Sequence, residues 1–345
     1  MIRVLVAEDS AVTRELLVAL LRAAPGFEVV GAAQDGLEAV EQAGRLRPDV
    51  ILMDIHMPRL DGLAATRRIM AQFPSPIVLV SAGFSRDDAT LSFEAIRAGA
   101  LTVLGKPAGP GHPDHARSTR ELLETVRLMS EVKVVQRWPR REPPAAMLPR
   151  PARTVRLVAI GASTGGPAVL AELLAELDGG SGPPILVVQH ITPGFTAGLV
   201  EWLSGETHFR VKLAEPGESV RSGSVYVAPD ARQMGVGPDG RIRLEPGVPA
   251  DAFCPSASYL FESVAQSHGS SAMGVLLTGM GKDGVTGLQR LRSAGGVTVA
   301  QDEATSVVFG MPGEAVRVGA AQYVLPPRAI ARMVRSLAGE RGSRR

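Results

Sequence analysis

The sequence predicts an α/β protein of two doubly wound domains, each built on a mainly parallel sheet. Short apolar runs alternate with segments of helical spacing up to residue 135, and the same alternation resumes at residue 155. Such alternation is typical of parallel sheets covered by helices. Between the two series, residues 136–154 carry five prolines and five arginines without apolar periodicity, so we expect an extended linker there.

The first domain, residues 1–135, is expected to contain five strands and five helices. Short apolar runs rich in branched residues predict the strands, and apolar residues three to four positions apart predict the helices. The expected strands are 4–7, 28–33, 50–54, 77–81 and 101–106. The expected helices are 12–21, 37–46, 63–72, 87–98 and 114–134. Each strand is followed by a helix, which predicts a single parallel sheet.

The second domain, residues 155–338, continues the pattern with more strands. The strands are expected at 157–160, 185–189, 210–213, 224–228, 241–244, 273–278, 297–300 and 322–325. Pro238-Asp239-Gly240 predicts a β-hairpin, because Asp-Gly favours tight turns between antiparallel strands. Residues 339–345 are expected to form a disordered tail.

Composition restricts the class of protein. The net charge of +2 gives no reason to expect a nucleic-acid partner, and the one cysteine, Cys254, excludes a disulfide within the chain. Acidic residues interrupt the first apolar run where a signal peptide would continue. Apolar runs fall short of the roughly 18 residues that a membrane span needs. We therefore expect a cytoplasmic protein without direct membrane insertion.

Polar side chains end four expected strands of the first domain. Glu8 and Asp9 follow the first strand, Asp54 ends the third, Ser81 the fourth and Lys106 the fifth. Carboxylates gathered at one edge of a sheet repel one another unless a cation intervenes, and Mg²⁺ suits such oxygen donors. A carboxylate beside Mg²⁺, a hydroxyl and a lysine is suited to attack a phosphoryl group. Simple helix caps would explain one acid, but four strand ends in order favour a site.

A second candidate site begins where the apolar run 157–160 ends in small residues around Ser163, before a helical pattern resumes. A strand, a glycine-rich turn and a helix would place this hydroxyl at the carboxyl edge of a sheet. The segment is either an activated serine or an anion cradle at a helix N-terminus. It lacks the G-x-G-x-x-G pattern and the P-loop lysine, which disfavours a nucleotide site.

His190 and Asp283 also follow apolar strands, so they are candidates for the base and for the group that orients it. Taken singly, each has a simpler interpretation, as a structural histidine and as the N-cap of the next helix. Three similarly placed strand ends favour a Ser-His-Asp triad, whose geometry does not depend on chain order. The order found here differs from that of α/β-hydrolases. Cys254 is expected to be an unreactive thiol rather than a nucleophile.

The first domain resembles the receiver domain of two-component response regulators over about residues 1–130. The resemblance rests on Glu8-Asp9-Ser10, Met53-Asp54-Ile55-His56-Met57-Pro58, Asp61-Gly62, Ser81-Ala82 and Lys106-Pro107. It implies that Asp54 accepts the phosphoryl group, and that Glu8, Asp9, Asp54 and the backbone carbonyl of His56 bind Mg²⁺. Ser81 and Lys106 would contact the phosphoryl group. Receivers commonly have an aromatic residue where this chain has Val103, which puts signalling through an aromatic rotamer in doubt.

The second domain resembles the catalytic domain of chemotaxis-type protein-glutamate methylesterases from about residue 155 to 338. The main matching segments are 160–166, 188–190 with 193–196, and 277–284, and the supporting ones are 227–229, 255–256 and 301–302. The resemblance implies that Ser163 is the nucleophile, His190 the base and Asp283 its orienting acid. It further implies that the backbone N–H of Met280 binds the oxyanion, with Thr164 at the edge of the site.

Together the two resemblances imply a phosphorylation-regulated hydrolase of glutamate γ-methyl esters on chemoreceptor-like proteins. Its esterase half needs no metal, and deamidation of glutamines stays open. A histidine kinase of a chemotaxis-like system would donate the phosphoryl group, and the unphosphorylated receiver is expected to cover the serine edge. The alternative is a non-catalytic protein, a receiver joined to a receptor-binding domain. The set of Ser163, His190 and Asp283 argues against that alternative.

Overall fold

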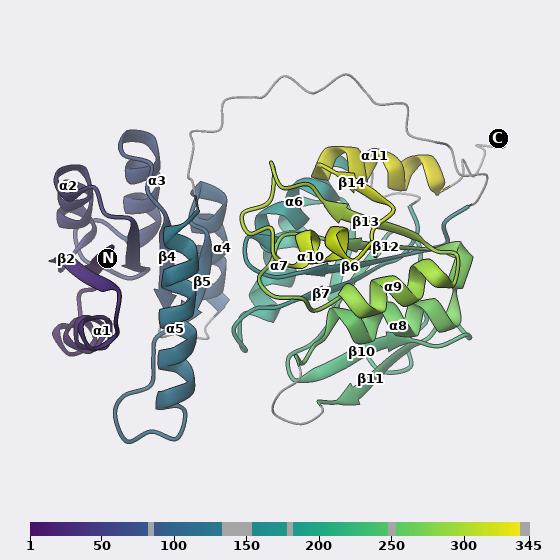
Figure 1. The fold of residues 1–345 in the computed structure, drawn as a ribbon, viewed down its shortest axis with the longest axis horizontal. Helices are drawn as coiled ribbons and strands as arrows, with labels where there is room; N and C mark the ends of the chain where they lie inside the picture. The colour runs from purple at the N-terminus through teal and green to yellow at the C-terminus, as the bar shows by residue number, and fades with distance from the viewer. Residues whose placement is uncertain (82–85, 133–153, 178–181, 248–252, 339–345) are drawn as a thin grey trace. The chain divides into compact units, whose positions relative to one another are not determined.

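The computed structural model describes residues 1–81, 86–132, 154–177, 182–247 and 253–338. The chain divides into two compact units, Met1–Arg141 and Glu142–Arg345. Each unit is a parallel sheet with helices on both faces (Figure 1). The expected linker, 136–154, and the expected tail, 339–345, lie outside the described residues except for Thr154.

The sheet of the N-terminal unit has the strand order β2-β1-β3-β4-β5, and all its pairs are parallel. This is the flavodoxin-like order, in which the chain reverses direction across the sheet beside β1. The strands are β1 (Ile2–Ala7), β2 (Phe27–Ala33), β3 (Val50–Asp54), β4 (Ile77–Ser81) and β5 (Thr102–Gly105). The helices are α1 (Ala11–Ala23), α2 (Gly36–Leu46), α3 (Gly62–Gln72), α4 (Arg86–Ala98) and α5 (His115–Ser130).

The C-terminal unit has a seven-stranded parallel sheet in the order β14-β13-β12-β6-β7-β9-β8. The strands are β6 (Leu157–Ala162), β7 (Ile185–Gln189), β8 (Arg210–Leu213), β9 (Ser224–Val227), β12 (Ala272–Leu276), β13 (Val297–Gln301) and β14 (Tyr323–Leu325). A separate antiparallel hairpin consists of β10 (Arg232–Val236) and β11 (Ile242–Pro246).

Helices cover both faces of this larger sheet. The helices α6, α7 and α11 pack together, and α8 packs on α9, which packs on α10. Their bounds are α6 (Gly166–Glu176), α7 (Thr196–Glu206), α8 (Ala257–Ser267), α9 (Val285–Ser293), α10 (Met311–Arg317) and α11 (Pro327–Leu337), with a short 3₁₀ turn at Gly269–Ser271. The hairpin packs against α8 through β10. After β6 the chain first adds β7, β8 and β9 next to one edge of that strand. It then crosses over, and β12 pairs with the opposite edge of β6.

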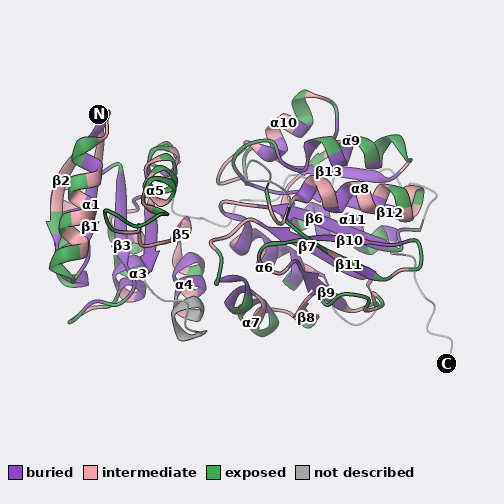
Figure 2. Ribbon diagram, turned by 90° about the horizontal axis from the view of Figure 1, so that it is seen from below, coloured by how far each residue is buried: buried purple, intermediate pink, exposed green. Residues whose placement is uncertain are grey.

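Burial explains why these strands are almost uniformly apolar. Every residue of β6, β7, β12 and β13 is buried, as Figure 2 shows for the strands between the helical layers. A parallel sheet covered on both faces leaves no strand face in water, so alternation of polar and apolar residues is lost. Buried polar groups such as Gln189, Thr278 and Gln301 instead mark the carboxyl ends of these strands.

The predicted fold class is confirmed, with local differences. The hairpin at Pro238-Asp239-Gly240 forms as expected, although its first strand, β10, was not among the predicted strands. Helix α5 ends at Ser130, four residues before the predicted end. Met129 in its last turn is buried, but the next residue after the helix, Glu131, is exposed, so little apolar packing favours a longer helix.

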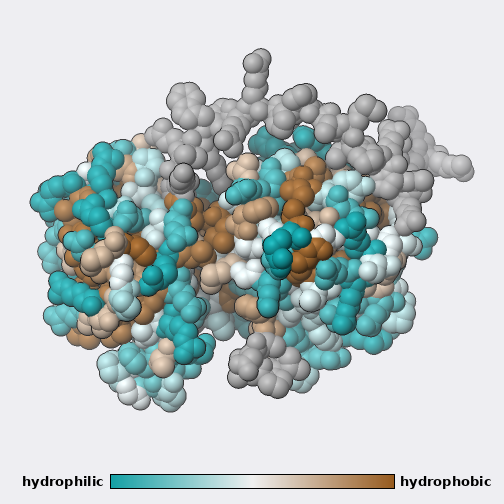
Figure 3. Space-filling view, viewed as in Figure 1, coloured by the Kyte–Doolittle hydropathy of each residue, from teal (hydrophilic) through white to brown (hydrophobic). Residues whose placement is uncertain are grey.

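The surface of both units is mostly hydrophilic on the face that Figure 3 shows, with apolar side chains gathered over α10. Exposed apolar residues of the C-terminal unit include Val316 on α10 and Met280 in the loop after β12. None of the described helices has the length and apolar character needed to cross a membrane.

Candidate active site and phosphoryl-acceptor site

Ser163 lies in the turn between β6 and α6, at the carboxyl edge of the central strand. Its backbone N–H donates to the carbonyl of Thr278 beyond β12, at 3.0 Å, and its carbonyl accepts from the Gln189 side chain at 2.8 Å. The turn closes through Gly165, whose φ of +77° favours glycine. Contacts to both neighbouring strand ends thus fix the position of the serine backbone.

His190 follows β7, the strand that pairs with β6. Ala162 pairs with Gln189 in this register, so Ser163 and His190 continue neighbouring strands at the same edge. The backbone N–H of His190 donates to the Ala162 carbonyl at 2.9 Å. Among the described contacts there is no hydrogen bond between the serine hydroxyl and the imidazole. Such bonds are often long in a free enzyme and tighten with substrate.

Asp283 and His190 are paired. Nε2 of His190 lies 3.0 Å from Oδ2 of Asp283, and both side chains are largely buried. An ionised carboxylate only accepts hydrogen bonds, so Nε2 carries the proton and Nδ1 of the neutral ring has the free lone pair. Nδ1 is buried and has no partner among the described residues. The pairing therefore leaves Nδ1 as the nitrogen able to take up a proton.

Asp283 is held by the N-terminus of α8. It accepts from the Ser256 hydroxyl at 2.8 Å and from the backbone N–H groups of Ala257 at 2.7 Å and Ser258 at 3.1 Å. Burial by itself would raise the pKa of Asp283. The hydrogen bonds and charge of His190, with those from Ser256 and Ala257, outweigh burial and keep the pKa well below its usual range. Asp283 is therefore ionised at neutral pH.

The N-cap interpretation of Asp283 for the helix that follows it is wrong. The N-cap of α9 is Gly284, which has no side chain to cap it. Ser256 caps α8 by accepting from the backbone N–H of Tyr259 at 3.3 Å while its hydroxyl donates to Asp283. The carboxylate thus lies at the positive end of a different helix, α8, which favours its charged form.

Free backbone donors surround the serine. The backbone N–H groups of Thr164 and Met280 have no acceptor among the described residues, and Met280 is exposed. Glycine at position 279 lets the Met280 loop approach the serine closely, because a Cβ on Gly279 would lie 2.6 Å from Ser163 Cβ. Unpaired N–H groups beside a nucleophile are the donors that an oxyanion requires.

The candidate phosphoryl-acceptor site gathers at the carboxyl edge of the N-terminal sheet. Carboxylate oxygens of Glu8, Asp9 and Asp54 lie within 4.8 Å of one another. The Lys106 ammonium lies 2.8 Å from Glu8 and 3.1 Å from Asp54. Ser81 is buried at the end of β4, and its neighbour in register is Gly105, directly before Lys106.

Electrostatics at this edge fit a divalent cation. Burial raises the pKa of both Glu8 and Asp54, and the charge and hydrogen bonds of Lys106 oppose this rise. Burial would lower the pKa of Lys106, but its hydrogen bonds and charge interactions with Glu8 and Asp54 raise it overall. Lys106 pairs with Glu8 and Asp54, and Asp9 is a third carboxylate beside them, so the cluster has negative charge left over for a hard cation with oxygen ligands. The residues present therefore fit Mg²⁺.

Two other positions have plain structural roles. Val103 is buried in β5, in register with Leu79, and therefore packs as a core residue. Cys254 is half-buried, and burial raises the pKa of its thiol, which keeps it protonated and unreactive at neutral pH.

Sequence reasoning missed three residues that build the site. Ser256 binds Asp283, Gln189 binds the carbonyls of Ser163 and His190, and the Phe253 ring stacks on His190. The Pro-Ser pair before a helical pattern is an N-cap signal that pointed to Ser256. A glutamine ending an apolar strand was a weaker signal for Gln189. Nothing in the local pattern pointed to Phe253.

Comparison with known proteins identifies the family. The family model described as CheB methylesterase matches residues 158–334, and the response regulator receiver domain model matches residues 4–116. The chain belongs to the CheB methylesterase family. It is therefore a hydrolase that combines a receiver domain with a methylesterase domain, as the order of the two units predicted.

Relatives match along the whole chain. A protein-glutamate methylesterase/protein-glutamine glutaminase of Geobacter metallireducens is 49% identical over 347 residues, which cover 99% of this chain and 100% of the relative. One from Myxococcus xanthus is 49% identical over 348 residues, covering 99% and 98%. The crystal structure of the Thermotoga maritima CheB methylesterase catalytic domain is 36% identical, with a TM-score of 0.50, and covers 53% of this chain and 98% of that one.

Proposed function

We propose that this protein hydrolyses glutamate γ-methyl esters on chemoreceptor-like proteins and that phosphorylation of its receiver regulates the reaction. The observation that carries the proposal is the pairing of His190 with Asp283 beside the loop of Ser163. The carboxylate has four donors and stays ionised, so it fixes the imidazole with Nδ1 as its basic atom.

The first half of the reaction forms an acyl-enzyme. Ser163 Oγ attacks the ester carbonyl carbon while Nδ1 of His190 takes the hydroxyl proton. The charged imidazolium is stabilised by Asp283 through the proton on Nε2. The backbone N–H of Met280, with Thr164 at the edge of the site, donates to the oxyanion. The tetrahedral intermediate then collapses, the C–O bond to the methoxy group breaks, and His190 returns the proton so that methanol leaves.

The second half restores the enzyme. A water molecule attacks the acyl carbon and gives its proton to Nδ1 of His190, and the imidazolium then protonates Ser163 Oγ as the ester bond breaks. A glutamate side chain leaves the site. The same sequence applied to a glutamine amide would release ammonia, so glutaminase activity uses the same residues.

The receiver supplies the control. Asp54 would accept a phosphoryl group from a histidine kinase, Glu8, Asp9, Asp54 and the backbone carbonyl of His56 would hold Mg²⁺, and Ser81 and Lys106 would contact the phosphoryl oxygens. Bound Mg²⁺ would supply neutralising charge for the transferring oxygens. Phosphorylation would shift the receiver away from a state that restrains access to Ser163. Because position 103 is a buried valine, this response would not use an aromatic rotamer there.

Methanol release from a methylated receptor tests the chemistry. Ser163→Ala is expected to abolish release, whereas Ser222→Ala, at an exposed serine of the same unit, leaves it unchanged. Equal rates for Ser163→Ala and wild type would rule out the assignment. For the control, phosphodonor should accelerate the wild type but not Asp54→Asn. If a fluorophosphonate fails to label Ser163 while receptor binding persists, the non-catalytic alternative is correct.

A further inference from the structure

We propose that Phe253 is a positioning residue for the general base, a proposal that rests on the proposed function. Its ring is stacked on the imidazole of His190, with centroids 4.6 Å apart and planes 6° from parallel. Phe253 precedes the segment that carries Ser256 and the N-terminus of α8. One short stretch of chain therefore holds both the orienting acid and the ring of the base.

Exposure argues against a role for Phe253 in the core. Its side chain is 53% exposed, and an exposed phenylalanine gains little stability from burial. The Phe253 side chain is nevertheless restrained, because the parallel contact with the imidazole limits the motion of both rings. The exposed ring thus contributes mainly to the geometry of His190.

The stack supplies a constraint that Asp283 cannot supply. A hydrogen bond to Nε2 fixes one atom of the imidazole and resists tilting of the ring plane only weakly. A parallel neighbour fixes the plane, so Nδ1 keeps its direction toward the hydroxyl that it deprotonates. It also shields one face of the ring from water. Misplacement of a catalytic group by about 1 Å can lower the rate about 100-fold.

Kinetics with Phe253→Leu and Phe253→Tyr test this role. Leucine keeps an apolar side chain without a flat ring, and we expect it to lower kcat about tenfold with KM changed less than about twofold. Tyrosine keeps the ring and should restore kcat. The rate of fluorophosphonate labelling of Ser163 should fall in parallel. Val324→Ala, at another exposed apolar residue, is the control, and thermal unfolding should be unchanged in all variants.

Three outcomes would overturn the proposal. They are wild-type kcat in Phe253→Leu, a loss confined to KM, and equal damage in Phe253→Tyr and Phe253→Leu. Failure of the proposed function looks different, because wild type would then release no methanol, or Ser163→Ala would match it. In that case Phe253 variants would have no esterase rate to change.

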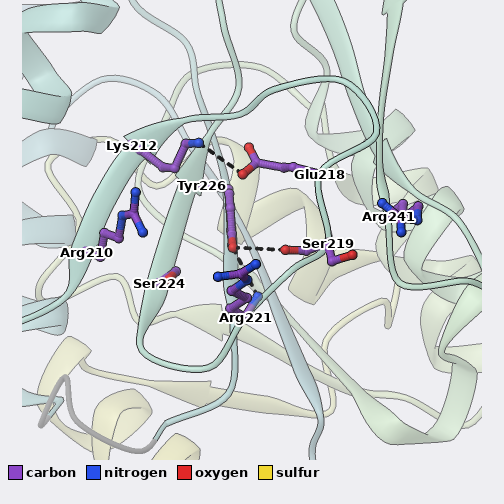
Figure 4. Close-up of a pocket in the computed structure, with 8 residues that line it drawn as sticks. All are labelled: Arg210, Lys212, Glu218, Ser219, Arg221, Ser224, Tyr226 and Arg241. Atoms are coloured by element: carbon purple, nitrogen blue, oxygen red, sulfur yellow. Dashed lines mark hydrogen bonds and ion pairs between the residues drawn. The ribbon is translucent and has the colours of Figure 1, made fainter.

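We also infer that a basic pocket at the far edge of the same sheet docks an acidic segment of the substrate protein. The pocket has a volume of about 440 Å³ and is lined chiefly by Arg210, Lys212, Glu218, Arg221, Tyr226 and Arg241 (Figure 4). Tyr226 forms its floor, with its hydroxyl accepting from the backbone N–H of Arg221 at 3.0 Å. This inference too rests on the proposed function.

Two arginines of this pocket differ from its lysine in having no hydrogen-bond acceptor within the part of the chain that the structure describes, although the charge of Arg210 is felt by Glu215. Lys212 is neutralised by Glu215 and Glu218, at 2.8 and 3.0 Å. The guanidinium groups of Arg210 and Arg221 have no acceptor among the described residues. Planar guanidinium groups bind carboxylates through paired hydrogen bonds. A pocket of this lining therefore favours a carboxylate-bearing ligand over an apolar one.

The position of the pocket suits a protein substrate. The pocket lies at the amino ends of β8 and β9, and β8 is three strand spacings, or about 14 Å, from β6 across the sheet. Val211 of β8 is level with Val158 of β6, five residues or about 16 Å along the strand from Ser163, so the total separation is about 22 Å. An α-helix covers about 22 Å in about 15 residues. A protein that presents esterified glutamates to Ser163 can therefore place an acidic side chain in the pocket at the same time.

The double variant Arg210→Gln/Arg221→Gln tests the docking. KM for the methylated receptor should rise about three- to tenfold at low salt, with kcat unchanged. At about 1 M salt the difference should disappear, because charges are then screened within about 3 Å. KM for a short uncharged glutamate methyl ester peptide should not change. Arg156→Gln removes an exposed charge elsewhere on the unit and is the control.

Three results would overturn the docking inference. They are an unchanged KM for the receptor, an equal rise in Arg156→Gln, and an equal rise with the short peptide. Inorganic phosphate is the second probe. If it binds wild type but not the double variant while receptor KM stays the same, the pocket takes a small anion instead. Loss of Ser163-dependent methanol release in wild type would instead refute the proposed function.

Discussion

His190 and Asp283 are 93 residues apart in the sequence, and their side chains meet at 3.0 Å. The carboxylate reaches the imidazole from a loop after β12, whereas the imidazole follows β7 on the other side of β6. The donors of α8 hold Asp283 ionised and fixed. The orientation of His190 therefore depends on a helix that contributes no reacting atom.

Replacement of Asp283 by asparagine should separate orientation from packing. The amide keeps the volume but can present its N–H₂ to the imidazole, which favours the wrong tautomer of His190. We expect kcat to fall about 10³- to 10⁴-fold with little change in KM. Asp239→Asn, in the hairpin turn, should retain wild-type kcat. Methanol release under saturating substrate measures both, and a loss below about tenfold for Asp283→Asn would contradict the triad.

Acid should weaken the C-terminal unit through Asp283. The folded protein holds the pKa of Asp283 below its unfolded value of 3.8, so its stabilisation is fully present above that pH. As the pH falls from 3.8 through the lower folded pKa, the unfolded chain binds a proton that the folded chain does not, and the free energy of unfolding decreases. Urea unfolding across this range should show a steeper decrease for wild type than for Asp283→Asn, by up to about 1.4 kcal/mol per pH unit. Parallel curves would show that Asp283 is not perturbed.

Alanine at Gly165 should disturb the serine loop. Its Cβ would lie 2.6 Å from Val307, at a φ of +77°, whereas Gly240 has a φ of +70° and no atom within 4 Å. We expect Gly240→Ala to lower the free energy of unfolding by about 1 kcal/mol through backbone strain and Gly165→Ala by about 3 kcal/mol through added overpacking. The loss of kcat, by at least about tenfold, should occur only at Gly165. Equal losses of kcat and of unfolding free energy in the two variants would show that the serine loop has no special need for glycine at position 165.

Magnesium should stabilise the receiver. Three carboxylates converge within 4.8 Å, so binding to the folded unit relieves their repulsion. At a Mg²⁺ concentration of 100 times Kd the free energy of unfolding should rise by about 2.7 kcal/mol. Thermal unfolding with and without Mg²⁺ measures this. Asp9→Asn should lose the gain, and Asp49→Asn, away from the cluster, should keep it. A gain retained in Asp9→Asn would exclude Asp9 as a ligand.

Much of the fold followed from local pattern. The strands β3, β4 and β7 have the bounds that the apolar runs predicted, because buried parallel strands are continuous apolar runs. The edge strand β8 also has its predicted bounds, and in it Arg210 and Lys212 alternate with apolar residues. Strand β10 was not predicted, because its first two residues, Arg232 and Gln233, are polar and Gly235 interrupts the apolar residues that follow. Its partner across the turn and the side chains of α8, rather than its own composition, make it a strand.

The candidate site was predictable where it lies at strand ends. Ser163, His190 and Asp283 each follow an apolar run, and parallel pairing brings such ends together. The sequence carries an N-cap signal at Ser256, but neither its contact with Asp283 nor the stacking of Phe253 on His190 was predictable. The residues involved lie at the start of α8 or just before it, and Ser256 is 27 residues ahead of Asp283. No local signal specifies which helix N-terminus will face which acid.

The strands β7 and β12 flank β6 on opposite sides, and residues 190–271 connect them in a stretch whose length can vary. They build one edge of the sheet and the hairpin, while the two flanking strands stay anchored beside β6. Insertions or deletions at the loop tips in this stretch would leave the spacing of the reacting groups intact. Changes in this stretch can therefore alter which protein substrate binds while the reacting groups keep their positions.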